Sequence, residues 1–438
     1  MARRHVLIGA GPAALAAAEA IRGADEQAQI TLVGADPYGY YSRPGLAYYL
    51  AGELPEPRLF PAARDEFAHL RVELVRDEVT AIDRAARTVT LRRGDPVPYD
   101  RLLVATGSQA VPARASGVEL DGVVKLDDLD DARDIVRRGG RGTRAVVVGG
   151  GITALEIVEG LRARGSQVDY LMRQDRYWRN VLSEPESRLV EDGLRREGIG
   201  LHHFTELARI LGRDGRVTGV ETTGGDVIPC DVVAVAIGVR PRVGLARDAG
   251  LDCGRGITVD EYLRSSDERV FAAGDVAEVL DAATGRPTME VLWNSAVAKG
   301  RVAGLNMATE AVHPYRRGVP LNITRLAGSR TTIIGTVGNG EDKDLETLAR
   351  GDSQTWSELG PAMLVEAQTR DARVRIELGE ATIVGAVVMG DQALSHALQD
   401  LVEGRVDVSA IAPRLREREA AVADIVTGFW QDWTARHG

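Results

Sequence analysis

The sequence contains few cysteines: only Cys230 and Cys253 occur among its 438 residues. Two thiols cannot supply a four-ligand zinc or iron–sulfur site, and these two do not form a Cys-x-x-Cys pair. A dithiol relay is therefore not expected, and the seven histidines show no spacing typical of metal ligands. The adjacent His202 and His203 fall on an expected strand, where they face opposite sides. We expect no metal, and two reduced core thiols of a cytoplasmic protein.

Positive charge is also in deficit, and long apolar runs are missing. Lys and Arg number 54 against 64 Asp and Glu, which gives a net charge of −10. Sequence-independent nucleic-acid binding needs a cationic face, so a protein that binds nucleic acid in this way is not expected.

No stretch approaches the roughly 18 consecutive apolar residues of a membrane-spanning helix. The 44% hydrophobic and 27% charged residues are typical of a soluble globular chain of two to three domains.

The apolar N-terminal segment has two interpretations. Residues 6–18 follow Arg3 and Arg4 and lead into Ala18-Glu19-Ala20, which resembles a secretory signal with its cleavage site. The alternative is a strand, a glycine turn and a helix, because residues 9–14 read Gly-Ala-Gly-Pro-Ala-Ala. A similar pattern at residues 149–154, deep in the chain, favours this second interpretation.

The first strand–turn–helix unit has the features of a dinucleotide site. After the expected strand 4–8, Gly9 permits a tight turn, Gly11 lets the backbone approach a pyrophosphate, and Ala14 allows close packing. The expected helix 12–22 offers its N–H groups and positive dipole end to the phosphates. Asp36 follows the second strand, 29–33, where an acid normally binds the adenosine ribose.

The second unit lacks this acid. Strand 145–148 leads through Gly149 and Gly151 into helix 152–164, and the next strand is 167–171. The expected acidic position holds Met172, and Arg173 and Arg176 follow. An Arg would pair with the 2′-phosphate of NADP, which favours NADPH. The alternative is NADH, with both arginines in a solvated loop.

Two further strands end in informative turns, at Thr106-Gly107 and at Gly274-Asp275. The order of the four motifs, over residues 4–310, resembles that of flavoprotein reductases of the pyridine nucleotide–disulfide oxidoreductase superfamily. The segment Tyr41-Ser42-Arg43-Pro44-Gly45-Leu46 narrows the resemblance to the ferredoxin/rubredoxin reductase branch and the flavin part of nitrite reductase large subunits.

The resemblance implies an α/β fold of two Rossmann-like three-layer domains and a small α+β C-terminal domain. The FAD domain would comprise residues 1–112 and 245–318, the NAD(P) domain 113–244, and the C-terminal interface domain 319–438. Expected strands in the last domain are 321–326, 331–337, 362–368, 373–378 and 382–389, followed by a helix 392–403. The charged tail 414–437 is expected to be helical, with Phe429, Trp430 and Trp433 in packing or a subunit contact. A homo-oligomer or a subunit of a complex is expected.

The resemblance also implies the site residues. The FAD contacts would come from Gly9, Gly11, Ala14, Asp36, Arg43, Asp275, Trp293 and Ala296. The NAD(P)H contacts would come from Gly149, Gly151 and Ala154, with Arg173 and Arg176 at the 2′-phosphate of NADP. Thr106 and Gly107, at the strand end where the chain crosses to the NAD(P) domain, complete the cofactor-binding set with Pro12, Ala13, Val79, Ile152, Gly238 and Gly274. Glu156 near the nicotinamide, with Arg43, Pro44 and Trp293 along the flavin, would form the catalytic set.

The sequence departs from the family pattern at two points. Pro44 stands where thiol-dependent members carry a cysteine, so a thiol mechanism loses its nucleophile. Ala47 and Tyr48 replace the Ser-Lys of many ferredoxin reductases, which leaves the tuning of the flavin open.

The expected function is that of an FAD-dependent NAD(P)H oxidoreductase passing electrons to a ferredoxin, a rubredoxin or a small oxidant. The alternatives are an electron-entry subunit of a nitrite reductase-like complex and a non-catalytic flavin-binding protein. Arg137, Arg138, Arg141 and Arg144 form either a docking patch for an acidic redox protein or a solvated linker.

Overall fold

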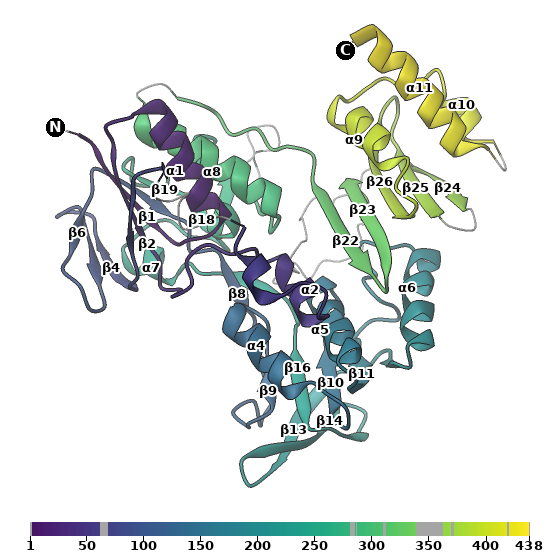
Figure 1. Ribbon diagram of the computed structural model, residues 1–438. Helices are drawn as coiled ribbons and strands as arrows, with labels where there is room; N and C mark the ends of the chain where they lie inside the picture. Colours follow the sequence, from purple (N-terminus) through teal and green to yellow (C-terminus); the bar gives the residue numbers. More distant parts are fainter. Residues whose placement is uncertain are drawn as a thin grey trace.

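The computed structural model describes residues 2–61, 69–280, 285, 287–309, 312–338, 362–368, 372–417 and 420–437. Three five-stranded sheets organise the chain (Figure 1). Each is covered by helices, and the C-terminal sheet with its helices lies at the upper right of this view. None of the helices in the described ranges is both long and apolar enough to cross a membrane.

The first sheet is entirely parallel and contains the predicted N-terminal unit. Its strand order is β19-β7-β1-β2-β3. The strands are β1 (Arg4–Ile8), β2 (Gln29–Val33), β3 (Val72–Val75), β7 (Arg101–Val104) and β19 (Val270–Ala272). Because β1 is an inner strand followed at once by helix α1 (Pro12–Ala24), the strand–turn–helix interpretation of this segment is confirmed.

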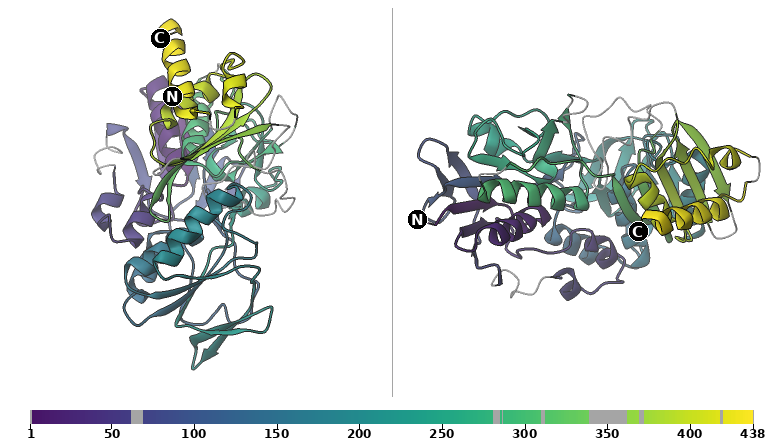
Figure 2. Two further views of the ribbon diagram at one scale, coloured as in Figure 1. Left: turned by 90° about the vertical axis from the view of Figure 1, so that its right-hand side faces the viewer. Right: turned by 90° about the horizontal axis from the view of Figure 1, so that it is seen from above.

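Helix α1 packs closely against helix α8 (Trp293–Ala308), and the two lie side by side when the molecule is seen from above (Figure 2, right). The close approach is possible because α1 is rich in alanine and α8 carries glycines at the crossing. A Cβ on Gly300 would lie 2.1 Å from the carbonyl oxygen of Ala13, and one on Gly304 would lie 2.4 Å from that of Ala17. The pair covers the first sheet at its glycine turn.

The second sheet repeats the parallel architecture, with the order β12-β11-β10-β16-β9. The strands are β9 (Val123–Val124), β10 (Arg144–Val148), β11 (Gln167–Leu171), β12 (Gly200–His202) and β16 (Val232–Val235). Its helices are α4 (Leu129–Arg138), α5 (Ile152–Ala163) and α6 (Glu184–Arg196). The repeated unit predicted from the glycine motifs is therefore confirmed.

Smaller elements connect and flank these sheets. They are β4 (Val79–Asp83), β5 (Thr88–Leu91), β6 (Val97–Pro98), β8 (Ser108–Ala110), β13 (Leu207–Arg213), β14 (Arg216–Thr222), β15 (Val227–Pro229), β17 (Val239–Pro241), β18 (Ile257–Val259), β20 (Ala277–Leu280) and β21 (Pro287–Thr288). The short helices are α2 (Gly45–Leu50), η1 (Glu56–Leu59), α7 (Gly244–Asp248) and η2 (Gly274–Val276).

The C-terminal sheet is antiparallel, in the order β22-β23-β26-β25-β24. The strands are β22 (Leu321–Leu326), β23 (Ser329–Gly335), β24 (Met363–Gln368), β25 (Ala372–Leu378) and β26 (Ile383–Gly390). Alternate residues face two cores: Val387 packs with the helices of the second sheet, and its neighbours Ala386 and Val388 pack under the C-terminal helices. All five predicted strands are present, while the domain limits stay a prediction.

The C-terminal helices differ from the expectation in their boundaries. Helix α9 (Ser395–Glu403) begins three residues later than predicted, and the tail forms two helices, α10 (Ala412–Leu415) and α11 (Val422–His437). The break lets α11 return along α9, where Phe429, Trp430 and Trp433 pack against the core. The indole of Trp430 donates to the Asp400 carboxylate of α9 at 2.8 Å. The aromatic residues therefore pack within the chain, and a subunit contact through their exposed parts stays a prediction.

A buried histidine in β1 predicts a pH-dependent stability. The side chain of His5 is 1% exposed, and burial lowers the pKa of its imidazole from 6.5 to about 4. Below pH 6.5 the unfolded chain therefore binds a proton that the folded chain excludes, so stability falls as the pH is lowered to about 4. We expect His5 to contribute about 3 kcal/mol of this loss in the free energy of unfolding. The free energy of unfolding, measured in urea across this pH range, should fall less steeply with decreasing pH in His5→Leu than in the wild type. The exposed His396→Gln should show the wild-type dependence on pH.

Candidate active site

The two glycine turns are built in the same way. Gly9 has φ +113°, and a Cβ there would lie 2.3 Å from the carbonyl oxygen of Ala105. Gly149 has φ +149°, and its Cβ would lie 2.2 Å from that of Ala236. Only glycine fits either position without moving the neighbouring strand, because both the backbone angle and the space exclude a side chain. The resemblance between the two motifs therefore reflects one geometry used twice.

Both turns leave a helix N-terminus without a side-chain cap. Gly11 precedes α1 and Gly151 precedes α5, each in extended backbone and without a capping hydrogen bond. A Cβ on Gly11 would meet nothing within 4 Å, so open space lies next to its backbone. Uncapped N–H groups and the positive end of the helix dipole are suited to bind phosphate oxygens.

One cavity of about 1410 Å³ begins at the first of these turns and runs to the N-terminus of α8. It brings together most of the predicted site residues, although they come from both the first and the second sheet and their helices. The predicted residues that line it are Gly9, Gly11, Pro12, Ala13, Asp36, Arg43, Pro44, Val79, Thr106, Gly107, Ile152, Glu156, Gly274, Asp275, Trp293 and Ala296.

The remaining predicted residues lie outside this cavity. Ala14 and Ala154 are buried between helix and strand, and Gly149 and Gly151 form the second turn. Arg173 and Arg176 follow the end of β11, and Gly238 follows β16 with φ +120°. Apart from Ala14, which lies in α1, these residues form a second group at the second sheet, and the contacts of both groups with a cofactor stay a prediction.

The chemistry of the cavity fits FAD. Its wall carries the uncapped N-terminus of α1, the carboxylate of Asp36 and the uncapped N-terminus of α8 at Trp293. Asp275 also lines it, and its carboxylate accepts a hydrogen bond from the Ser108 hydroxyl at 2.7 Å. An adenosine, a pyrophosphate, a ribityl chain and a ring system need acceptors, phosphate-binding N–H groups and apolar walls, and this cavity offers all three.

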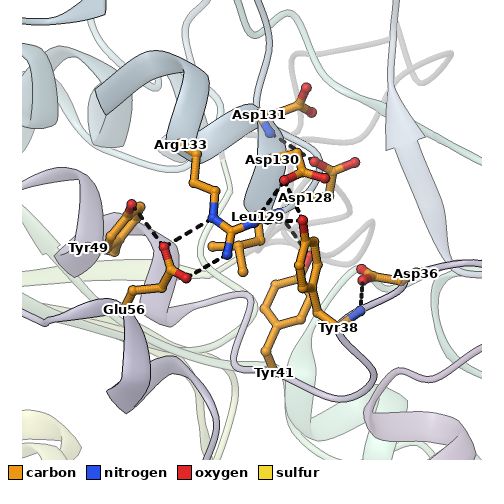
Figure 3. Close-up of polar contacts among 10 residues, drawn as sticks. All are labelled: Asp36, Tyr38, Tyr41, Tyr49, Glu56, Asp128, Leu129, Asp130, Asp131 and Arg133. Atoms are coloured by element: carbon orange, nitrogen blue, oxygen red, sulfur yellow. Dashed lines mark hydrogen bonds and ion pairs between the residues drawn. The ribbon is translucent and has the colours of Figure 1, made fainter. Parts of the chain in front are cut away.

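The loop that carries Asp36 is attached to helix α4 of the second sheet (Figure 3). Tyr38 donates from its hydroxyl to Asp130 at 2.7 Å, and Arg133 donates to the same hydroxyl at 2.6 Å. Arg133 also forms an ion pair with Glu56 at 2.6 Å. Sequence analysis did not identify Tyr38, Glu56 or Arg133, because partners separated by 77 to 95 residues leave no local pattern.

Arg43 and Tyr41 form a second attachment of this loop. The Arg43 guanidinium lies 5.6 Å from the centre of the Tyr41 ring and donates to the carbonyl of Asp127 at 2.6 Å. The Tyr41 hydroxyl accepts from the backbone N–H of Leu129 at 3.1 Å, and burial raises the pKa of Tyr41 to about 12. Burial also raises the pKa of Asp36. The positions of Asp36 and Arg43 therefore depend on α4 and the segment before it.

The C-terminal sheet also contributes to the cavity, which sequence analysis missed. Arg325 of β22 lies in its wall, 5.5 Å from the centre of the Tyr48 ring, and forms an ion pair with Glu53 at 2.7 Å. Glu159 of α5 lines the same end and accepts from the backbone N–H of Gly328 at 3.2 Å. Burial raises the pKa of Glu159 to about 7. The three parts of the chain thus meet at one end of the cavity.

The predicted basic patch is largely neutralised. Arg138 pairs with Asp121 at 2.6 Å and Arg144 with Asp231 at 2.9 Å, and Arg137 pairs with Asp134. Arg138 and Arg144 thereby join α4 and β10 to neighbouring segments, whereas the Arg137 pair lies within α4. Pairing with carboxylates leaves less positive charge to attract an acidic partner. The choice between a docking patch and a solvated linker stays a prediction.

Neither cysteine lines the cavity. Cys230 is buried, and burial raises the pKa of its thiol to about 12, which disfavours the reactive thiolate. Only His202 lies on the expected strand, since β12 ends there and His203 is in the following turn. The two imidazoles contact different carboxylates, those of Asp169 at 2.7 Å and Glu191 at 3.0 Å.

Comparison with known proteins agrees with this geometry. Residues 3–300 match the family described as pyridine nucleotide-disulphide oxidoreductase. The ferredoxin–NAD(+) reductase component of the biphenyl dioxygenase system of Paraburkholderia xenovorans (strain LB400) is 35% identical over 80% of this chain and 84% of its own length. Rubredoxin–NAD(+) reductase of Pseudomonas putida is 29% identical over 78% of this chain and 92% of its own.

A solved structure shows the same fold over nearly the whole chain. The ferredoxin reductase of the CYP199A2 system from Rhodopseudomonas palustris superposes with a TM-score of 0.84 at 24% identity, covering 97% of this chain and 99% of that one. One conclusion follows from the sequence match, the two glycine turns and the cavity that residues of α1, α5 and α8 line together. The chain belongs to the pyridine nucleotide–disulphide oxidoreductase family and has its two Rossmann-like units and C-terminal sheet.

Proposed function

We propose that the protein passes electrons from NADH or NADPH through FAD to a small redox protein of the ferredoxin or rubredoxin class. The observation that carries this proposal is the single cavity that joins the α1 turn, the side chains of Ile152 and Glu156 on α5, and the start of α8. A bound flavin would accept a hydride from the nicotinamide and release the electrons singly or in pairs.

The residues of the chain supply position and electrostatics. Arg43 and Pro44 would lie along the flavin, and Glu156 would orient the nicotinamide against it, which is an orientation effect on the rate. The N-terminus of α8 would stabilise negative charge at the adjoining edge of the flavin through its dipole. No thiol takes part in this proposal, because Pro44 occupies the cysteine position and neither cysteine lines the cavity.

The acceptor would approach where the cavity opens to solvent. Tyr48, Trp293 and Ile323 line the cavity and are 42%, 52% and 64% exposed. Exposed apolar side chains of this size are typical of a contact surface for another protein. Relatives named as ferredoxin and rubredoxin reductases support the same acceptor class.

Absorbance of the purified, FAD-loaded protein tests the proposal. Anaerobic NADH or NADPH should bleach the visible flavin band, and oxidised ferredoxin or rubredoxin should then restore it. A protein that takes up no flavin, or a band that neither nucleotide bleaches, would contradict the proposal. If small oxidants restore the band but no ferredoxin or rubredoxin of a broad panel does, the acceptor is not a redox protein of this class.

The nucleotide preference is proposed to depend on Arg173. This side chain is exposed directly after β11, and no acid follows that strand until Asp175, which pairs with Arg176 at 2.8 Å. Arg173→Asp should lower the ratio of kcat/KM for NADPH to that for NADH by about tenfold or more, because a carboxylate repels the 2′-phosphate. Arg213→Asp in the β13–β14 hairpin makes the same charge change and should leave the ratio unaltered. An unchanged ratio in Arg173→Asp would refute the assignment.

A further inference from the structure

We propose that Lys299 is a positioning residue whose buried ammonium group is the counter-charge for the FAD diphosphate. FAD binding would then favour the protonated form of this lysine. The inference rests on the proposed function only in that the cavity binds FAD. Lys299 lies in α8 and its side chain is 1% exposed, although lysine is almost never found fully buried without a partner.

Lys299 lies directly behind the cavity wall where the phosphates are expected. Its Nζ is 3.5 Å from the carbonyl oxygen of Gly274, and Gly274, Asp275 and Ala13 all line the cavity. The next residue in α8, Gly300, packs against the backbone of Ala13 in the first turn of α1. The ammonium group is therefore close to Gly274 of the cavity wall, and both Gly274 and Gly300 pack against Ala13 in the first turn of α1.

The charged neighbours leave this ammonium without a close carboxylate. Glu290 and Asp275 attract it and Arg317 repels it, but it forms no ion pair with any residue in the described ranges. Glu290 instead accepts from the hydroxyls of Ser295 at 2.7 Å and Tyr315 at 3.4 Å. Asp275 accepts from the Ser108 hydroxyl.

A buried ammonium with one long hydrogen bond destabilises the cofactor-free protein. Burial lowers the pKa of Lys299. A diphosphate at the start of α1 would place negative charge beside the ammonium and favour its protonated form. FAD binding and Lys299 protonation should therefore be linked, so that FAD affinity falls as alkaline pH removes the proton.

The test compares Lys299→Met, which keeps length and removes charge, with Arg301→Met on the exposed side of the same helix. FAD dissociation constants of the apoproteins would be measured by fluorescence titration between about pH 7 and pH 9.5, a range that ends below the ordinary lysine pKa. We expect Lys299→Met to bind FAD about tenfold or more weakly at neutral pH. Its affinity should vary less with pH than that of the wild type. Arg301→Met should match the wild type.

A second measurement separates this role from ordinary packing. Loss of packing would lower the melting temperature of the apoprotein, whereas loss of an uncompensated buried charge should raise it, by about 2–4 °C. Wild-type FAD binding should also take up protons at alkaline pH, as measured by calorimetry in two buffers. If Lys299→Met does not fold, proton uptake by the wild-type protein still tests the proposal.

Affinity of Lys299→Met within twofold of the wild type, or wild-type binding without proton uptake, would overturn the proposal. So would a pH-independent loss of affinity with a lowered melting temperature. A wild-type protein that binds no FAD would instead refute the proposed function, so the two failures are distinguishable.

Discussion

Arg375→Met should lower the free energy of unfolding by about 3–5 kcal/mol, because it leaves two buried carboxylates without their cation. The Arg375 side chain in β25 is 1% exposed and donates from Nε to the Glu186 carboxylate of α6 at 2.9 Å. It also pairs with Glu377 and donates to the carbonyls of Val181 at 2.6 Å and Val337 at 2.8 Å. This cluster joins the C-terminal sheet to the second sheet.

Guanidinium unfolding followed by circular dichroism would measure the effect on the FAD-saturated protein. Arg188→Met breaks an exposed ion pair with Glu184 within α6, and it should lower the free energy of unfolding by less than about 1 kcal/mol. Burial raises the pKa of Glu377 even with Arg375 present. Mild acid should therefore restore part of the stability of Arg375→Met by protonating a carboxyl. A loss no larger than that of Arg188→Met would show that the cluster contributes little.

Gly300→Ala should destabilise the protein by about 3 kcal/mol or more and weaken FAD binding. Alanine normally stabilises a helix relative to glycine by roughly 1 kcal/mol. Here the added methyl would lie 2.1 Å from the carbonyl oxygen of Ala13, so α8 must move away from α1. Because Ala13 lines the cavity at the first turn of α1, the same displacement disturbs the expected pyrophosphate site.

Gly428→Ala in α11 is the matched control, since an added Cβ there meets nothing within 4 Å. It should stabilise the protein by about 0.5–1 kcal/mol, the ordinary effect of this exchange in a helix. Opposite signs for the two variants in denaturant unfolding would establish that the α1–α8 crossing depends on Gly300. If both variants change the free energy of unfolding in the same direction, the close approach of α8 to α1 at Gly300 is not important for stability.

Much of the fold was predictable because its signals are local. Strands β2, β11 and β22 were predicted to the residue, since continuous or alternating apolar residues between turn residues define a strand without reference to its partners. Helices α4 and α6 were not predicted. Few apolar residues mark them, although each has a local start signal: Asp128 caps α4, and Ser183 and Glu186 have the spacing of a capping box before α6.

The glycine motifs alone determined where the two dinucleotide turns lie, because a positive φ and the absence of a Cβ are properties of single residues. Only the tertiary structure decided that β22 reaches the cavity, that Arg133 holds the loop of Asp36, and that Lys299 is buried behind Gly274. These relations join parts of the chain that are far apart in sequence. They depend on how whole helices and sheets pack, and no local pattern encodes that packing.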